Sequence, residues 1–321
     1  MLSAQAATKD SEIVVKLVHH KPCLGLPTRY LRAGRVNSFT LTQPLLVDKE
    51  PIFDLILNKL ASRMKAINPD RPLRILDIGC GPAFVIDRLV EVANGHHIHY
   101  VGIDLSKEMT TSVAQSQSLH QRRNMEFELH SGINVPVEGL VRAFQQNIER
   151  RFDAIFSLQF SHYLPTTLIS PLGIEYSEHG LHPICRDTFW RQCFTLLDRG
   201  GMFFDFDDVV GKDDSETREL EREWDWYGLQ RMTDPRALAA IGTHDVELYR
   251  RIKARYVDGV PLKLSLERFA KARRERRLHD REEPASLDFI ATNLDLIFDE
   301  LLTYRHPDLR KFYLWMASKS S

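Results

Sequence analysis

Two glycines and an acid stand where an α/β sheet could bind a nucleoside. Residues 75–78 form an apolar run typical of a strand buried on both faces, and Gly79 and Gly81 follow it ahead of a segment with helical spacing. Glycine lets the backbone approach a ligand that a Cβ atom would block, and the start of a helix offers free N–H groups. A second predicted strand, residues 99–104, ends in Asp104, whose carboxylate can accept hydrogen bonds from two ribose hydroxyls. We therefore predict a nucleoside-binding site.

The glycine pattern narrows the choice of nucleoside. It reads D-x-G-x-G-P from Asp77 to Pro82 and lacks the third glycine of the dinucleotide fingerprint. A nucleoside with an uncharged or zwitterionic tail therefore fits better than one with a pyrophosphate. Two alternatives stay open: an NAD-dependent dehydrogenase, and a glycine turn that only packs a helix onto the sheet.

Four motifs in order resemble those of the class I S-adenosylmethionine-dependent methyltransferases. Residues 76–82 are similar to the first motif of this family, and Asp104 matches its ribose-binding acid. Residues 152–157 resemble its fourth strand and residues 197–204 its fifth, so that the resemblance covers roughly residues 72–210 and the C-terminal end. It implies an α/β fold, a three-layer sandwich around a seven-stranded, mostly parallel sheet with a reversed final hairpin. It also implies S-adenosyl-L-methionine as the cofactor.

The resemblance also implies where the cofactor is held. The expected cofactor contacts are Asp77, Gly79, Cys80, Gly81, Asp104, Leu105, Ser131, Gly132 and Ser157. Many family members have an aspartate for the adenine amino group where this chain has Ser131, so we expect that contact from Ser131 or from the backbone.

The chemistry of methyl transfer directs attention to the segment after the fourth strand. The sulfonium of the cofactor already makes the methyl group electrophilic, so the protein chiefly aligns a nucleophile and removes its proton where necessary. His162 is the candidate general base, because an imidazole titrates near neutral pH, and Gln159 is a candidate for orienting the acceptor. The alternative for His162 is support of the loop.

Aromatic and acidic side chains near the same edge are candidates for the acceptor. The expected substrate contacts are Tyr30, Tyr163, Asp205, Asp207 and Trp226. Asp205, Asp207 and Asp208 could bind an amine, hold a divalent metal or remain solvated. We predict no metal site, because the sequence does not identify the further ligands that one would need. Trp226 and its aromatic neighbours are either packing residues or a cage for a cation.

The elements that position these residues divide the chain into four segments. We expect an N-terminal flap and leading helix at 1–70, the cofactor-binding core at 71–210, a helical insertion or lid at 211–285, and completion of the core sheet at 286–321. Residues 21–43 are expected to be irregular and, with the insertion, to close the pocket. The insertion is expected to contain helices at 213–232, 235–256 and 263–278. Their apolar stripes are narrow, so we expect them to pack onto the core and not to form a core of their own.

Composition limits the partners. The 321 residues are 43% hydrophobic and 27% charged, and the net charge of −1 provides no overall attraction to nucleic acid or anionic membrane. No apolar run approaches the length of a membrane span, and residues 1–10 lack the features of a signal peptide, so a cytoplasmic location is expected. The four cysteines are scattered and are expected to be free thiols. The oligomeric state cannot be read from the sequence.

These observations favour transfer of a methyl group to a nitrogen, oxygen, sulfur or carbon atom of a small metabolite. A long loop at 164–188, the flap and the insertion would enclose such an acceptor. One alternative is an RNA methyltransferase that uses the basic residues of 271–277, although acids surround this run and a solvated helix face is the expectation. The lysine that commonly follows the glycine turn in cap methyltransferases is also missing at Pro82 and Ala83. The other alternative is a non-catalytic partner protein that binds the cofactor.

Overall fold

The fold was obtained as a computed structural model of the chain. The structure describes residues 15–19, 35–67, 71–86, 88–89, 96–115, 125–132, 151–164, 166, 185–280, 282 and 284–320. Tyr30, most of the expected flap and most of the loop at 164–188 lie outside these residues. None of the helices described is both long and apolar enough to cross a membrane.

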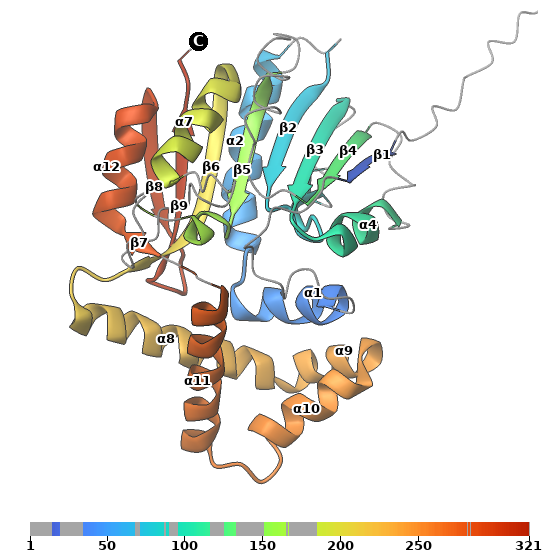
Figure 1. The fold of residues 1–321 in the computed structure, drawn as a ribbon, viewed down its shortest axis with the longest axis vertical. Coiled ribbons are helices and arrows are strands. Elements are labelled where there is room, and N and C mark those ends of the chain that lie inside the picture. The colour runs from blue at the N-terminus through green and yellow to red at the C-terminus, as the bar shows by residue number, and fades with distance from the viewer. Residues whose placement is uncertain are drawn as a thin grey trace, which may run out of the picture.

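One mixed sheet organises the molecule (Figure 1). The strands are β1 Val15–His19, β2 Leu73–Ile78, β3 Ile98–Asp104, β4 Met125–Ser131, β5 Phe152–Leu158, β6 Leu197–Val210, β7 Ala285–Ser286, β8 Glu300–Arg305 and β9 Phe312–Ser318. Their order is β1-β4-β3-β2-β5-β6-β9-β8, with β7 paired to β6. Strands β1 to β6 pair in parallel along this order, and β9 runs antiparallel to both β6 and β8. The reversed final hairpin is therefore confirmed.

The sheet has two strands more than the expected seven. β1 adds a strand at one edge, where Val15 pairs with Phe127 of β4 and His19 with Ser131. The sequence left residues 11–20 open between strand and helix, and pairing with a distant edge strand decides the matter. β7 is a two-residue strand that returns the chain from the insertion to the core.

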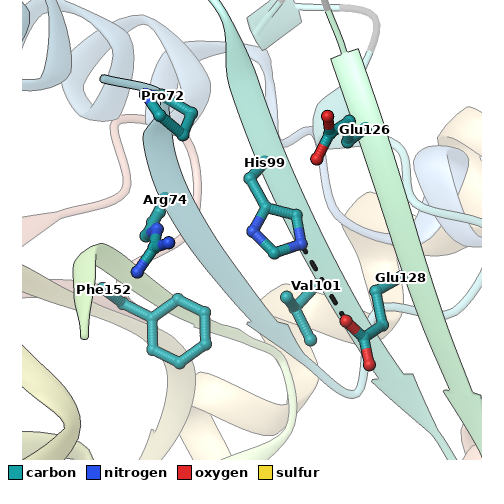
Figure 2. A pocket seen from close by; sticks show the side chains of 7 residues that line it. All are labelled: Pro72, Arg74, His99, Val101, Glu126, Glu128 and Phe152. Carbon is teal, nitrogen blue, oxygen red and sulfur yellow. Dashed lines mark ion pairs between the residues drawn. The ribbon is translucent and has the colours of Figure 1, made fainter. Parts of the chain in front are cut away.

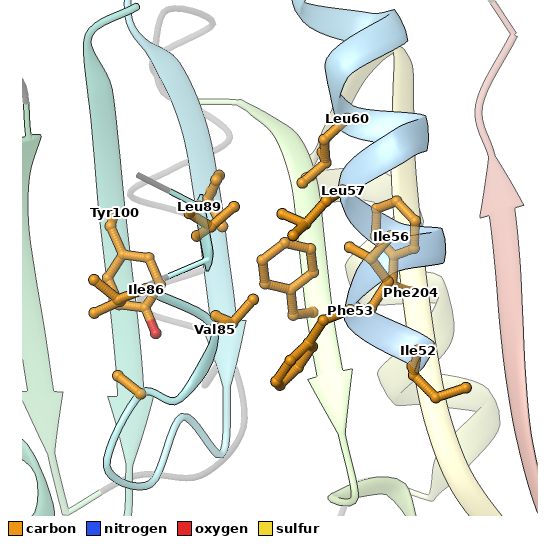
Figure 3. Close-up of a cluster of buried hydrophobic side chains, with 14 of the residues drawn as sticks. Ile52, Phe53, Ile56, Leu57, Leu60, Val85, Ile86, Leu89, Tyr100 and Phe204 are labelled. Carbon is orange, nitrogen blue, oxygen red and sulfur yellow. The ribbon is translucent and has the colours of Figure 1, made fainter. Parts of the chain in front are cut away.

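Helices cover both faces of the sheet and make it the middle of three layers. The helices described are α1 Arg35–Leu46, α2 Glu50–Ala66, α4 Lys107–Gln115, α7 Arg186–Leu196, α8 Asp214–Thr233, α9 Pro235–His244, α10 Val246–Tyr256, α11 Leu262–Asp280 and α12 Leu287–Ile297, with a 3₁₀ turn at Ser161–Tyr163. Ile52, Ile56 and Leu60 of α2 lie beside Phe204 of the sheet, in a buried cluster that extends to Tyr100 on β3 (Figure 3). On the other face, α7 and α12 bury side chains against β6 and β9 in a second apolar cluster. The predicted α/β sandwich is confirmed.

The insertion differs from its expected form in two respects. The predicted helix at 235–256 is divided at Asp245, whose carboxylate accepts a hydrogen bond from the Leu248 N–H at 2.8 Å and so starts α10. The insertion also has a small core of its own, which contains Leu229, Met232, Leu238, Ile241, Ile252 and Phe269. The expectation that its helices only pack onto the main core is therefore wrong. Leucines of α1 complete this small core, a contribution that the sequence did not reveal.

Helix α1 also corrects the expectation of an irregular flap. Residues 35–43 are helical, and α1 lies between the sheet and the insertion (Figure 1). Both lie beyond the carboxyl ends of the parallel strands, where ligands of open α/β sheets bind. The additions to the core are therefore placed over the edge that the glycine turn occupies.

Candidate functional site

The glycine turn has the backbone conformation that its sequence predicts. Gly79 and Gly81 have positive φ angles of 69° and 52°, a region that residues with a Cβ atom rarely adopt. A Cβ atom at Gly79 would also lie 2.7 Å from the ring of Phe160. Ala83 continues the turn at a φ of 56°. The turn therefore needs glycine at Gly79 for two independent reasons, conformation and space.

Asp104 is fixed beside this turn by the backbone. Its carboxylate accepts hydrogen bonds from the Gly81 N–H at 2.8 Å and the Ser106 N–H at 2.7 Å. Burial raises the pKa of Asp104, while these backbone bonds oppose the rise. The Leu105 N–H also acts on this carboxylate. A carboxylate has about four acceptor positions, and a side chain of intermediate exposure can still accept from ribose hydroxyls. Asp104 is therefore placed by the backbone where it can accept a hydrogen bond from a ribose hydroxyl.

A second acid, Asp77, lies at the base of the turn. It is buried and accepts a hydrogen bond from the Tyr100 hydroxyl at 2.5 Å. Burial raises its pKa to about 7, opposed by the Tyr100 bond and by the charge of Lys49. Neither Tyr100 nor Lys49 was singled out in the sequence, because only the tertiary fold lets Tyr100 bond to Asp77 and the charge of Lys49 act on it.

The remaining expected cofactor residues lie along the same edge. Ser131 is the register partner of Asp104 on the neighbouring strand, and its hydroxyl lies 2.7 Å from Nδ1 of His19. Gly132 follows with a φ of 86°, and its N–H donates to the Leu105 carbonyl at 3.2 Å. These three positions lie together near the ribose-type acid, as adenine contacts require.

Cys80 and Ser157 are inside the protein at this edge. Cys80 is buried in the turn, and burial raises the pKa of its thiol well above the ordinary value, so it acts as a small apolar residue. Ser157 is buried near the end of β5, opposite Asp205 of β6. Cys80 is thus part of the glycine turn, and Ser157 lies next to Asp205, the first of the three acids near the end of β6.

Asp207 accepts two hydrogen bonds from His162 and a third from the neighbouring Ser161. Nδ1 of His162 lies 2.5 Å from one carboxylate oxygen, and the other oxygen accepts bonds from the His162 N–H at 2.7 Å and the Ser161 hydroxyl at 2.8 Å. This arrangement fixes the ring and places the Nδ1 proton toward Asp207, so Nε2 is the free basic nitrogen. Burial lowers the pKa of His162, but the charge and hydrogen bond of Asp207 raise it by more, and the net shift is upward. Asp207 therefore fixes the orientation of the imidazole.

Gln159 stands next to this pair in a strained conformation. Its φ is 62°, an uncommon value for a residue with a side chain, and its N–H donates to the Phe206 carbonyl at 2.6 Å. Its side-chain carbonyl accepts a hydrogen bond from the amide of Gln43 on α1. The N-terminal helix thus reaches the site directly, and Gln43 is a site neighbour that sequence analysis missed.

The expected substrate residues separate into two groups. Tyr163 lies beside His162, with ring centroids 4.1 Å apart and the rings tilted by 48°, and Asp207 is hydrogen-bonded to His162. Asp205 instead is fully buried and accepts a bond from the Trp190 indole at 3.2 Å, while burial raises its pKa to about 7. Trp226 is 41% exposed on α8, and no contact among the described residues joins it to His162. Of the expected substrate residues that the structure describes, Tyr163 and Asp207 are the two that lie at the candidate base.

A buried network of charges lies directly behind the acids. Asp208 pairs with Arg277 at 2.5 Å and with Lys311 at 3.0 Å, and these cations hold its pKa below the ordinary range against the effect of burial. Glu221 of α8 also pairs with both cations. The network therefore ties α8 and α11 of the insertion to the end of β6.

Trp224 is at the centre of this network. The charged groups of Arg273, Lys311 and Arg277 lie 4.6, 5.0 and 5.6 Å from its ring centroid. Arg273 also pairs with Asp225 at 2.5 Å. Trp224 of the aromatic cluster therefore does contact cations, but these are side chains of the protein and not a ligand.

The network corrects the expectation of a solvated basic face. Arg273 is buried, and Arg277 is mostly covered by its three acidic partners. A signal was present in the sequence, because Phe269, Arg273 and Arg277 follow one another at intervals of four residues and share a helix face. That face is apolar at Phe269, so burial of the two arginines could have been inferred.

His162, Asp207 and Asp208 are close enough together to bind a metal ion, with ligand atoms within 4.8 Å of one another. Their charges are already compensated, because Arg277 and Lys311 hold Asp208 while His162 holds Asp207. Two fixed cations beside the site repel a divalent ion. The geometry therefore favours an organic site at this edge.

A separate hollow lies near the amino ends of the central strands (Figure 2). It is lined by Pro72, Arg74, His99, Val101, Glu126, Glu128 and Phe152. His99 and Glu128 approach to 4.0 Å across it. Its position near the starts of β2, β3, β4 and β5 sets it apart from the glycine turn, which follows the end of β2.

Comparison with known proteins agrees with this geometry. Residues 76–203 match the family described as "Methyltransferase domain". No curated protein matches the chain.

The solved structures that match this chain do so at low sequence identity. The CurJ carbon methyltransferase is 12% identical, with a TM-score of 0.48, over 84% of this chain and 54% of that one. An O-methyltransferase family protein from Burkholderia thailandensis is 11% identical, with a TM-score of 0.49, over 92% of this chain and 62% of that one. The plantazolicin methyltransferase BpumL, in complex with SAH, is 11% identical, with a TM-score of 0.45, over 91% and 93% of the two chains.

This chain therefore spans between one half and two thirds of the length of the first two of these relatives. The assignment rests on the family match and on the strand order with its reversed final hairpin. Residues 76–203 therefore match a methyltransferase domain, and the strand order with its reversed final hairpin is the one that the class I resemblance implies.

Proposed function

We propose that the protein transfers a methyl group from S-adenosyl-L-methionine to a nucleophilic atom of a small molecule. The observation that carries the proposal is the placement of two sites at one sheet edge. Asp104 and the glycine turn can hold a nucleoside, and His162 with Asp207 can accept a proton close by. A nucleoside site alone is also compatible with a non-catalytic binding protein, whereas an oriented base favours an enzyme.

The residues present fit the cofactor. Asp104 can accept hydrogen bonds from the ribose hydroxyls, Ser131 and Gly132 lie where adenine would be contacted, and Gly79 allows close approach of the backbone. When bound, the cofactor supplies an electrophilic methyl group. The residues around the glycine turn therefore need only to position the methyl group. Other residues of the chain must orient the acceptor and remove its proton.

His162 is the residue that prepares the acceptor. With Nδ1 directed to Asp207, its Nε2 can take the proton of a hydroxyl, an amine or an activated carbon as the acceptor attacks. Asp207 stabilises the imidazolium that results, in the manner of the acid in a Ser-His-Asp triad. Gln159 and Tyr163 are positioned to orient the acceptor beside it.

A small molecule is the acceptor class that the surroundings favour. α1 and the insertion stand over the sheet edge, which suits an enclosed pocket better than an open approach. Arg273 and Arg277, which an RNA substrate would need, are neutralised inside the protein. We infer that the insertion is a cover for the site and that nucleic acid is not the substrate.

The test is incubation of the protein and a cell metabolite extract with isotopically labelled methyl donor, followed by untargeted mass spectrometry. A labelled small molecule should appear with the wild-type protein and not with His162→Ala. Label in RNA, or no label in any product while the cofactor binds, would contradict the proposal and favour one of the two alternatives.

A further inference from the structure

Lys49 occupies a fixed position at the carboxyl edge of the sheet. Its carbonyl accepts hydrogen bonds from the Ile52 N–H at 3.0 Å and the Phe53 N–H at 2.8 Å, so that it caps α2. The preceding residue, Asp48, is held by two partners: its carbonyl accepts from His306 Nε2 at 2.6 Å, and its carboxylate pairs with Arg231 at 3.2 Å. The final hairpin and the insertion therefore both fix the backbone from which this lysine extends.

The Lys49 side chain reaches toward the glycine turn. Its Nζ lies 5.9 Å from the centroid of the Phe84 ring, and Phe84 directly follows the turn. The acids that act on it electrostatically are Asp77 and Asp207. Burial lowers the pKa of Lys49 to about 8, while these two acids oppose the change. The ammonium is therefore placed next to the glycine turn by its contact with Phe84, and the charges of Asp77 and Asp207 both act on it.

No hydrogen-bond or ion-pair partner of the Lys49 ammonium occurs among the residues that the structure describes. This contrasts with Arg273, Arg277 and Lys311, each of which has a carboxylate within ion-pair distance. A partly buried cation that lacks a partner is costly unless a ligand supplies one. An anionic group of a ligand bound at this edge of the sheet would supply the missing partner of the Lys49 ammonium.

We propose that Lys49 binds the carboxylate at the amino-acid end of the cofactor, an inference that rests on the proposed function. S-adenosylmethionine and its product carry an amino acid at the end opposite adenine, and such a zwitterion needs a cation for its carboxylate and an acid for its ammonium. Lys49 and Asp77 supply this pair at the end of the turn away from Ser131. Asp104 lies between the two ends and binds the ribose.

Two ligands that differ in the amino-acid end can test the contact between Lys49 and the carboxylate. S-adenosylhomocysteine carries the amino-acid end, whereas 5′-methylthioadenosine shares the adenosine and the thioether but lacks it. Calorimetry of both ligands is carried out on the wild-type protein, on Lys49→Met, and on Lys65→Met as an exposed control on the same helix. Lys49→Arg serves as the variant that keeps the charge.

Lys49→Met should weaken S-adenosylhomocysteine about 10- to 100-fold, the range of one charge-assisted hydrogen bond, and leave 5′-methylthioadenosine within about twofold. Lys65→Met should change neither ligand, and Lys49→Arg should restore most of the lost affinity. Unchanged affinity for S-adenosylhomocysteine in Lys49→Met, or an equal loss for both ligands, overturns the assignment of Lys49 alone. If the wild-type protein binds neither ligand, the proposed function itself is overturned, and this inference with it.

Discussion

At the carboxyl edge of the sheet, the side expected to bind the cofactor and the side next to the insertion are built by different means. On the cofactor side, backbone geometry does the positioning: Gly79 and Gly81 adopt positive φ angles, and Asp104 is held by N–H groups. On the insertion side, buried charges do it, because Asp208 at the end of β6 is joined to α11 by Arg277. The local sequence determines the conformation of a site built from the backbone. A charge network instead depends on which distant helices and strands pack together. The comparison predicts that the two sides respond differently to substitution.

Arg277→Met should have the largest effect on stability. It leaves Asp208 and Glu221 without one of their buried partners, and loss of one member of such a group costs about 3 to 5 kcal/mol. Urea unfolding would measure the change, with Arg274→Met as an exposed control on the same helix. A cost below about 1 kcal/mol would show that the network contributes little, and the contrast between the two sides would fail.

His162→Ala should lower turnover by roughly 100-fold or more while leaving the affinity for S-adenosylhomocysteine nearly unchanged, because only the proton acceptor is removed. Single-turnover rates and calorimetry measure the two quantities. His244→Ala, an exposed histidine on α9, is the control. A loss of less than about fivefold would assign His162 to support of the loop.

The pH profile is a smaller and sharper test of the His162–Asp207 pair. The basic form of the imidazole is neutral, and the pKa of His162 is raised, so the rate should increase with pH through a midpoint above 6.5. Asp207→Asn removes the charge that raises this pKa, and the midpoint should move to lower pH, although Asp208 and Glu282 still act on the ring. A midpoint that does not move would show that Asp207 does not tune the base.

The same shift bears on stability. The folded-state pKa of His162 is above its ordinary value, so the charged pair contributes its full stability below that ordinary value. The contribution is lost as pH rises through the folded-state pKa. Unfolding free energies measured from pH 6 upward should therefore fall by less in Asp207→Asn than in the wild-type protein.

What could be predicted from the sequence follows the same division. The glycine turn and the strand that ends in Asp104 could be inferred because turn conformation and apolar patterning are local properties, whereas the sheet with its reversed final hairpin followed from the resemblance to the family. The edge strand β1 could not be assigned, since its partner β4 is more than one hundred residues away. Lys49 carried no local signal either, because a lysine before a helix is ordinary until the fold places Asp77 and Asp207 near it.

The insertion shows where a local pattern was present but was read incorrectly. The acidic neighbours of residues 271–277 indicated a solvated face, yet Arg273 lies at 6% exposure against Trp224. Four-residue spacing from Phe269 placed the two arginines on the buried side, but only the approach of α8 supplies the carboxylates that make such burial possible. The placement was predictable, and the partners were not.

The most direct test of the central claim is calorimetry of S-adenosylhomocysteine with Asp104→Ala. Loss of two charge-assisted hydrogen bonds to the ribose should weaken binding by about 2 to 4 kcal/mol. Asp295→Ala, an exposed acid on α12, should bind like the wild-type protein, and urea unfolding would show that Asp104→Ala remains folded. Unchanged affinity in a folded Asp104→Ala, or tighter binding of NAD than of S-adenosylhomocysteine by the wild-type protein, would contradict the assignment of this edge as a methyl-donor site.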